Sequence, residues 1–115
     1  MYKQNKYRNK ITELDGIKFH SRKEAARYSE LKLLEKSGII KDLRLQVPYQ
    51  LIPPMRINDK HHRAILYYAD FVYIQCIDNK EIVEDVKGMQ TDIFKIKYRL
   101  MKQIYDIDIK ITWHL

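Results

Sequence analysis

The chain has 115 residues, 45% of them hydrophobic and 32% charged, which suits one soluble domain with a single core. Its 22 Lys and Arg side chains exceed its 15 Asp and Glu side chains, and the net charge of +7 favours an anionic partner such as nucleic acid, although small soluble proteins are often basic. The only cysteine, Cys76, excludes an internal disulfide and a zinc site with several thiolates, and is typical of a cytoplasmic protein. No apolar run approaches the ~20 residues that span a bilayer, so we expect no membrane association.

Residues 1–10 are polar and basic, and we expect them to form an arm outside a single domain of residues 11–115. Two interpretations of this arm stay open. It follows a phosphate backbone with its cations, or it is an ordinary solvated tail. The cations are Lys3, Lys6, Arg8 and Lys10.

The first predicted elements are a small hairpin over Ile11–Phe19, turning at Asp15-Gly16, and a helix that begins after Ser21 as N-cap. The helix should run to about Ser37, and the glycine that follows should close it in the left-handed conformation. Its apolar residues recur at helical spacing and predict one buried face: Ala25, Tyr28, Leu31 and Leu34.

Glu24 falls close to the middle of that buried face. It has two interpretations. In a capping box its carboxylate would reach back to the backbone of Ser21. Alternatively, it would point toward the sheet and add a third acidic group to the aspartates described below.

Three stretches rich in β-branched and aromatic residues predict a meander of strands: Leu43–Ile52, Ala64–Ile74 and Glu81–Lys87. Met55–Arg63, between the first two, is expected to be a polar loop. Its adjacent histidines do not indicate zinc, because no cysteine pair or other cluster of ligands accompanies them.

Thr91 can cap a second helix, and the alternating residues of Ile107–Trp113 predict a fourth strand. The exposed cations Lys95 and Arg99 form either a solvated surface or a phosphate-binding row. This order of elements predicts an α/β (α+β) fold: a mixed four-stranded sheet, its last strand parallel to the third, with a helix on each face. The apolar face of the second helix is expected to comprise Ile93, Ile96, Leu100, Met101 and Ile104.

Ionisable side chains interrupt two of the apolar strands. Asp85 and Lys87 lie two residues apart and therefore share a face, and pairing of the strands would bring Asp70 to about 5 Å across from that face. Two carboxylates and an ammonium group on an apolar sheet are unfavourable unless they are used. A divalent cation held by the carboxylates, with the lysine directing a water or a phosphate, would use them.

Three stretches carry a resemblance to a known superfamily: Ser21-Arg22-Lys23-Glu24, Tyr68-Ala69-Asp70-Phe71 and Val83-Glu84-Asp85-Val86-Lys87-Gly88. On this order of elements they resemble the PD-(D/E)XK nucleases, and within these the phage endonuclease I group that resolves Holliday junctions. The chain also resembles a small phage family of unknown function in that superfamily. Ala69 departs from the pattern, because the superfamily motif has proline there. The resemblance implies a restriction-endonuclease-like core in αβββαβ order.

The resemblance also implies roles. Asp70 and Asp85 would bind Mg²⁺ or Mn²⁺ and Glu24 would complete the acidic set, while Lys87 would orient or activate the attacking water and stabilise the phosphate. Gln46 would contact metal-bound water or phosphate. The implied function is a metal-dependent DNA endonuclease that resolves branched DNA, a phage protein in the cytoplasm of a bacterial host. A homodimer is expected, because symmetric junction cleavage needs two active sites.

Three other functions stay open. The chain is a nicking or end-cleaving nuclease on duplex or single-stranded DNA, or a non-catalytic nucleic-acid-binding module, or a protein-interaction protein. A binding module would show salt-sensitive DNA affinity without a metal-dependent product.

Overall fold

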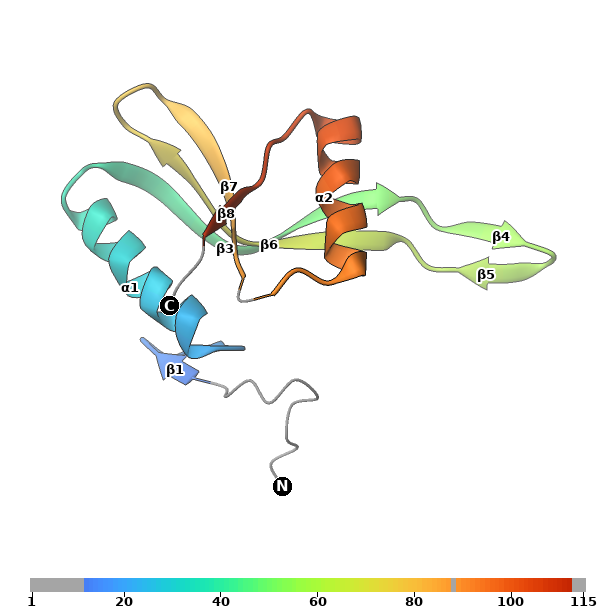
Figure 1. The fold of residues 1–115 in the computed structure, drawn as a ribbon, viewed down its shortest axis with the longest axis horizontal. Helices are drawn as coiled ribbons and strands as arrows, with labels where there is room; N and C mark the ends of the chain where they lie inside the picture. Colours follow the sequence, from blue (N-terminus) through green and yellow to red (C-terminus); the bar gives the residue numbers. More distant parts are fainter. Residues whose placement is uncertain (1–11, 88, 113–115) are drawn as a thin grey trace.

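The computed structural model describes residues 12–87 and 89–112 (Figure 1). The predicted arm of residues 1–10 lies outside the described residues. Four strands form the main sheet in the order β3-β6-β7-β8. β3, β6 and β7 are antiparallel neighbours and β8 is parallel to β7, so the predicted mixed sheet with a parallel last strand is confirmed. The strand bounds are Ile40–Ile52, Ile65–Gln75, Lys80–Val86 and Lys110–Thr112.

The predicted amino-terminal hairpin is formed by β1 (Thr12–Leu14) and β2 (Ile17–Phe19). Both residues of its two-residue turn have positive φ, 53° at Asp15 and 74° at Gly16, which is the geometry that matches the twist of two paired strands. The Asp-Gly pair therefore sets this hairpin, as predicted.

Helix α1 (Arg22–Lys36) has the predicted ends. The Ser21 hydroxyl accepts a hydrogen bond of 3.2 Å from the backbone N–H of Glu24. Ser37 caps the other end, and Gly38 follows with φ of +77°. Leu31, in the middle of the apolar stripe, is fully buried.

The two helices cover two separate cores on the sheet (Figure 1). α1 packs Tyr28 and Leu31 against Phe71 of β6, whereas α2 (Asp92–Tyr105) packs Phe94 and Met101 in the other core. The sheet is therefore sandwiched between the helices, as the sequence predicts.

The predicted buried face of α2 is correct in part. Met101 is fully buried and Leu100 packs against the same core, but Ile93 is 67% exposed, Ile96 is 60% exposed and Ile104 is 44% exposed, while Phe94 is buried instead. Two adjacent apolar stripes run along this helix, and the hydrophobic pattern alone does not select the stripe that meets the sheet. The larger Phe94 ring fills the space beside Tyr67.

The predicted polar loop at Met55–Arg63 is instead a second hairpin. It consists of β4 (Met55–Ile57) and β5 (Lys60–His62), joined by Asn58 and Asp59, whose φ values of 49° and 63° are those of a two-residue hairpin turn. Asparagine and aspartate tolerate this left-handed conformation better than other non-glycine residues.

Strand β8 is shorter than the predicted Ile107–Trp113. Ile107 is used to close α2: Asp106 adopts the left-handed conformation with φ of 56°, and the Ile107 N–H donates to the Met101 carbonyl at 3.3 Å. Trp113 lies outside the described residues. β3 begins at Ile40, three residues earlier than expected, and contains a bulge where Asp42 has φ of 55°.

Strands β3 and β6 change faces together at one position. Ala69 packs in the α2 core and Phe71 in the α1 core, although residues two apart on a regular strand share a face. Val47 and Leu45, their partners on β3, change sides in the same way. Gln46, between them, has φ of 50°. The change of face leaves Gln46 and Asp70 between the two cores.

Within the described part of the chain, no helix is long and apolar enough to cross a membrane.

Candidate functional site

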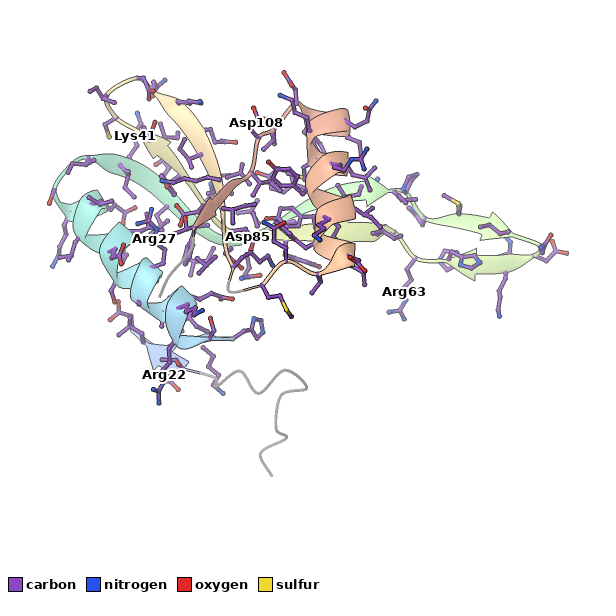
Figure 2. All side chains as sticks on the ribbon, in the orientation of Figure 1. Arg22, Arg27, Lys41, Arg63, Asp85 and Asp108 are labelled. Atoms are coloured by element: carbon purple, nitrogen blue, oxygen red, sulfur yellow. The ribbon has the colours of Figure 1, made fainter. Side chains whose placement is uncertain are left out.

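Asp70 and Asp85 lie together where β6 and β7 pair. The pairing of β6 with β7 ends at Phe71 and Glu84, and the two aspartates are the next residue of each strand. They lie close enough for the charge of Asp85 to act on the Asp70 carboxyl group. Asp85 is only 2% exposed, and Asp70 is half-buried. The backbone N–H of Val86 donates to Asp70 Oδ2 at 2.9 Å and thereby fixes the Asp70 carboxylate beside β7. Figure 2 shows Asp85 at the centre of the fold, between the two helices.

The two oxygens of Asp85 have different surroundings. Oδ2 accepts a 2.6 Å hydrogen bond from the Tyr67 hydroxyl. Oδ1 is buried and receives no hydrogen bond from the described residues, although Lys87 Nζ lies 3.1 Å away. The Lys87 ammonium group also lies 4.3 Å from the centre of the Phe94 ring, an arrangement that favours a cation. A buried carboxylate oxygen beside one cation, without a hydrogen bond, can accept a further ligand.

The Asp70 carboxyl group resists ionisation. Burial, the charge of Asp85 and the charge of Glu24 raise the pKa of Asp70 to about 8, against an opposing hydrogen bond from the Val86 N–H. The site therefore holds less negative charge at neutral pH than its formal count of carboxyl groups suggests.

Gln46 completes the surroundings of Asp70. Its Nε2 donates to Asp70 Oδ1 at 3.2 Å, across the β3–β6 pair. The left-handed backbone of Gln46 is sterically unfavourable for a residue with a side chain, by about 1 kcal/mol or more. Strained residues of this kind concentrate at functional sites. Sequence analysis predicted a role for Gln46, but not this backbone conformation.

Glu24 shows one half of the predicted capping box. Its backbone N–H donates to the Ser21 hydroxyl, whereas the backbone group that lowers the pKa of its carboxylate belongs to His20 and not to Ser21. Burial raises the pKa of Glu24 most; the charge of Asp85 raises it further, whereas the charges of His20 and Lys87 lower it. The Glu24 carboxylate therefore lies within electrostatic range of Asp85 and Lys87, at the amino-terminal turn of α1.

The remaining predicted residues lie elsewhere. Lys95 and Arg99 are exposed on α2, where their side chains face solvent. The arm cations Lys3, Lys6, Arg8 and Lys10 lie outside the described residues.

Tyr67, in contrast, was not singled out by sequence analysis. Nothing local to Tyr67 indicates its role, because it meets Asp85 only through the pairing of two strands.

A divalent cation fits the oxygen ligands of this site. Among residues 12–87 and 89–112, no three His, Cys, Asp or Glu side chains are placed to enclose a metal ion by themselves. Mg²⁺, however, is usually bound through one or two carboxylates, retained waters and substrate phosphates. Asp70 and Asp85 supply two carboxylates, and the Oδ1 atom of Asp85 has no hydrogen bond from the described residues to lose.

A hydrogen-bonded ion pair lies on the other face of β7, around the fully buried Glu84. Arg27 donates to both Glu84 oxygens, at 2.7 and 2.9 Å, and the Tyr73 hydroxyl donates at 2.6 Å. Burial opposes the charge of Glu84, but the hydrogen bonds from Arg27 and Tyr73 outweigh it and lower the pKa of Glu84. Both carboxylate oxygens are therefore occupied, and this cluster joins α1 to the sheet.

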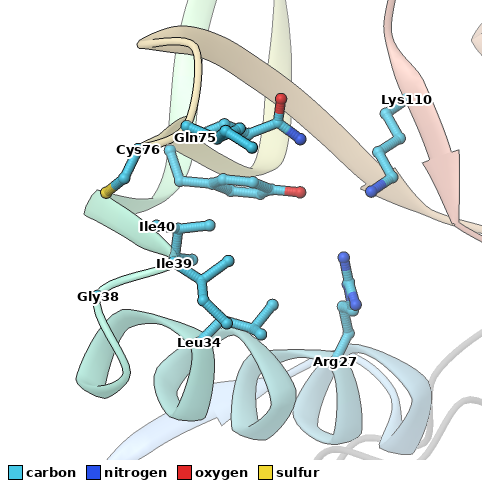
Figure 3. Close-up of a pocket in the computed structure, with 10 residues that line it drawn as sticks. Arg27, Leu34, Gly38, Ile39, Ile40, Gln75, Cys76 and Lys110 are labelled. Atoms are coloured by element: carbon cyan, nitrogen blue, oxygen red, sulfur yellow. The ribbon is translucent and has the colours of Figure 1, made fainter.

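A cavity of about 540 Å³ adjoins the Glu84 cluster and is lined on opposite sides by Arg27 and Lys110 (Figure 3). Its floor is apolar and includes Leu34, Ile40 and Tyr73. None of the residues that line it belongs to the aspartate site. This cavity and the aspartate site are thus separate features of the fold.

Comparison with known proteins connects the chain with one family. No curated protein and no solved structure matches it. One family model matches residues 4–115, which cover every element described above. The chain therefore belongs to the DUF1064 family, which is described as a protein of unknown function.

Proposed function

We propose that this protein is a metal-dependent DNA endonuclease whose active site comprises Asp70, Asp85, Lys87 and Glu24. The observation that carries the proposal is the buried Asp85 Oδ1, which has no hydrogen bond from the described residues, lies 3.1 Å from Lys87 Nζ and belongs to a carboxylate beside Asp70. Buried polar atoms without partners are rare in folded proteins and often have a functional reason. Asp70 and Asp85 would hold Mg²⁺ or Mn²⁺, which would supply positive charge to neutralise the charge that develops on a phosphate.

The side chains around the proposed metal site have separate roles. Tyr67 holds Asp85 through Oδ2 and leaves Oδ1 directed to the site, while Gln46 and the Val86 N–H orient Asp70. The Lys87 ammonium group, kept near Asp85 by ion pairing and by the Phe94 ring, is suited to contact a phosphate oxygen or an attacking water. Glu24 adds negative charge near Asp85, which favours binding of a cation at the site.

The finer parts of the proposal follow from the resemblance described above. The sheet and its two helices would form a restriction-endonuclease-like core, the preferred substrate would be branched DNA, and two chains would act as a homodimer. The net charge of +7 supports an anionic substrate, and a homodimer would place two such sites on one junction.

The test is cleavage of a synthetic four-way junction, a flap and a plain duplex, each with Mg²⁺, Mn²⁺ or a chelator. The wild type should cut at least one substrate only when metal is present. Asp70→Asn and Asp85→Asn should each reduce the rate at least 100-fold, whereas Asp108→Asn, purified identically, should not, because Asp108 is exposed and pairs with the surface Lys102. Cleavage by Asp70→Asn at the wild-type rate would show that the activity does not come from this site.

A further inference from the structure

The β4–β5 hairpin extends away from the rest of the fold. Figure 1 shows it beyond α2, at the end of the molecule opposite α1. Its strands pair only with each other, as a separate two-stranded sheet, and all six strand residues are exposed. Isolated two-stranded hairpins are marginally stable in water. The described part of the chain thus contains an exposed two-stranded ribbon that no other described element covers.

The side chains of this ribbon are suited to a polyanion. Residues 55–63 carry three permanent cations, Arg56, Lys60 and Arg63, and one carboxylate, Asp59. Arg56 donates one N–H to the Asp59 carbonyl at 2.8 Å, which fixes the guanidinium group and leaves its other donors available. Two histidines, His61 and His62, lie on the same strand as Lys60.

The ribbon also presents apolar groups that meet no core. Ile57 pairs with Lys60 and Met55 with His62, so the two apolar side chains share one face of the ribbon. Ile57 is 50% exposed and Met55 is 40% exposed. A second copy of the hairpin is an unfavourable partner for this face, because like charges would meet across the interface. A partner that combines negative charge with apolar base edges complements it better.

We propose that the β4–β5 hairpin enters the major groove of duplex DNA. This inference rests on the proposed function in taking DNA as the substrate, but it concerns binding and not the chemical step. The major groove is about 12 Å wide and admits a two-stranded β-ribbon. Met55 and Ile57 would face the base edges, and Lys60, which shares their face, would reach a phosphate at the wall of the groove. Arg56, on the opposite face, and Arg63 would contact phosphates as well.

The fold fixes the distance between the hairpin and the aspartate site. β4 and β5 continue the directions of β3 and β6, the strands that carry Gln46 and Asp70. Nine residues separate Asp70 from His61, which corresponds to about 30 Å along an extended chain. With about 3.4 Å of rise for each base pair, the hairpin should contact duplex roughly nine base pairs from the phosphate at the aspartate site.

The first experiment measures binding of a 30-base-pair duplex in chelator, where cleavage is suppressed. The triple variant Arg56→Glu, Lys60→Glu, Arg63→Glu should bind at least 10-fold more weakly than the wild type. The slope of its log affinity against log salt concentration should also be shallower, by the amount expected for the loss of up to about three phosphate contacts. The matched control changes Lys36, Lys41 and Lys80 to Glu. These residues are exposed at the other end of the molecule, and Figure 2 shows Lys41 and Arg63 far apart. The control should bind within 3-fold of the wild type.

The second experiment locates the hairpin on DNA without weakening its charge. Cys76 is exposed and is the only cysteine, so Cys76→Ser combined with Asn58→Cys gives one attachment point at the hairpin tip. The tip lies twelve residues from Asp70, about 40 Å along an extended chain, so an iron chelate attached to the thiol introduced there should cut a bound duplex in a cluster roughly twelve base pairs from the metal-dependent nick. The same chelate on Cys76 of the otherwise unchanged chain should not produce that cluster.

The possible outcomes separate this inference from the proposed function. Loss of binding in the hairpin variant alone, in a protein that cuts no DNA with any metal, supports the groove contact and removes the nuclease. Equal binding by hairpin variant and control, in a protein that does cut DNA, overturns the groove contact and leaves the nuclease. If the wild type binds no DNA, or if the hairpin variant turns a sedimenting dimer into a monomer without a change in DNA affinity, the groove contact is wrong.

Discussion

Asp70 and Asp85 lie beside each other on two antiparallel strands, and of these two carboxylates only that of Asp70 has both oxygens hydrogen-bonded by described residues. Asp70 accepts from Gln46 and from the Val86 N–H, whereas Asp85 accepts from Tyr67 through Oδ2 alone. The two carboxylates repel each other when both are charged. Protonation of Asp70, whose pKa is raised to about 8, relieves this repulsion, and a bound cation would relieve it too. The stability of the metal-free protein should therefore decrease as the pH rises and Asp70 ionises.

Asp70→Asn should stabilise the metal-free protein at high pH. The pKa of Asp70 rises from an ordinary value of 3.8 to about 8 on folding, chiefly through burial, so the folded chain holds an extra proton between about pH 4 and pH 8. Stability due to Asp70 is complete at the acidic end of this window and is lost as pH rises through it. Asp70→Asn removes this dependence, and we expect a gain of about 2 kcal/mol at pH 9 and little change at pH 4. Urea unfolding in chelator at both values measures it.

The control for this prediction is Asp108→Asn. Asp108 is a carboxylate with 81% side-chain exposure, and its partner is Lys102. A surface pair of this kind contributes at most about 1 kcal/mol, so its loss should change stability slightly and in the unfavourable direction. A stabilisation of Asp70→Asn that is equal at pH 4 and pH 9 would mean that charge repulsion at Asp70 is not the cause.

Divalent cations should raise the melting temperature of the wild type. A ligand at 100 times its Kd stabilises a folded protein by about 2.7 kcal/mol, which is several degrees for a domain of this size. The shift with Mn²⁺ should be larger at pH 8.5 than at pH 6, because the proton on Asp70 competes with the metal ion. Asp85→Asn should abolish the shift and Asp108→Asn should retain it, as followed by thermal scanning. A shift that persists in Asp85→Asn would place the cation elsewhere.

Tyr67→Phe should weaken the aspartate site without changing its charge. The substitution removes the donor that lies 2.6 Å from Asp85 Oδ2 and leaves both oxygens of a buried carboxylate without a hydrogen bond from the described residues. We expect a loss of stability of about 1–3 kcal/mol at neutral pH in chelator, and a partial recovery with Mn²⁺. Tyr68→Phe, on the same strand but at a residue that is 51% exposed, is the control and should be nearly neutral in chemical denaturation.

The ion pair between Arg27 and Glu84 should contribute to the fold and not to the aspartate site. Arg27→Met leaves a fully buried, charged Glu84, and we expect a loss of roughly 3 kcal/mol at pH 7. The difference from the wild type should shrink toward pH 4. The lowered pKa of Glu84 keeps the wild-type pair intact until the pH falls below the ordinary value of 4.5, whereas the unpaired Glu84 takes up a proton at higher pH.

The control for Arg27→Met is Lys32→Met, which removes a more exposed pair with Glu35. Its expected cost is below about 1 kcal/mol at both pH values. DNA binding by Arg27→Met in chelator should equal that of the wild type at temperatures where both are folded. A selective loss of binding in this variant would move the functional site toward the cavity beside Arg27.

The elements that sequence analysis predicted correctly are those whose signals are local. Ser21 and Gly38 mark the ends of α1, and Asp15-Gly16 marks the first hairpin, because capping and positive φ depend on one or two residues. The second hairpin was predicted as a loop because its turn, Asn58-Asp59, lacks the glycine that usually identifies a two-residue turn, and its strands have no buried face.

The features that could not be predicted depend on how elements meet. The stripe of α2 that is buried depends on the space left beside Tyr67, and the role of Glu84 depends on the position of Arg27 on another element. At the aspartate site, the alternation of β7 correctly predicts that Asp85 and Lys87 share a face. It does not predict that β3 and β6 exchange faces at Gln46 and Asp70, because a regular strand would not do so.

Gln46 allows a test of that exchange. Its φ of 50° is a conformation that glycine adopts freely and alanine does not. Gln46→Gly and Gln46→Ala both remove the hydrogen bond to Asp70 Oδ1, but only the glycine variant relieves the backbone. We therefore expect Gln46→Gly to be more stable than Gln46→Ala by about 1 kcal/mol in urea unfolding. This order is the reverse of the usual one, because glycine normally weakens a strand.

The comparison needs a matched position on the same strand without a left-handed backbone. Gln50 is also on β3, is also exposed and is absent from the residues with positive φ. Gln50→Gly should be less stable than Gln50→Ala by about 0.5–1 kcal/mol. Opposite orders at the two positions would locate the backbone strain at Gln46, where β3 changes faces and where the side chain reaches Asp70. The same order at both positions would mean that the backbone of β3 is not strained at Gln46.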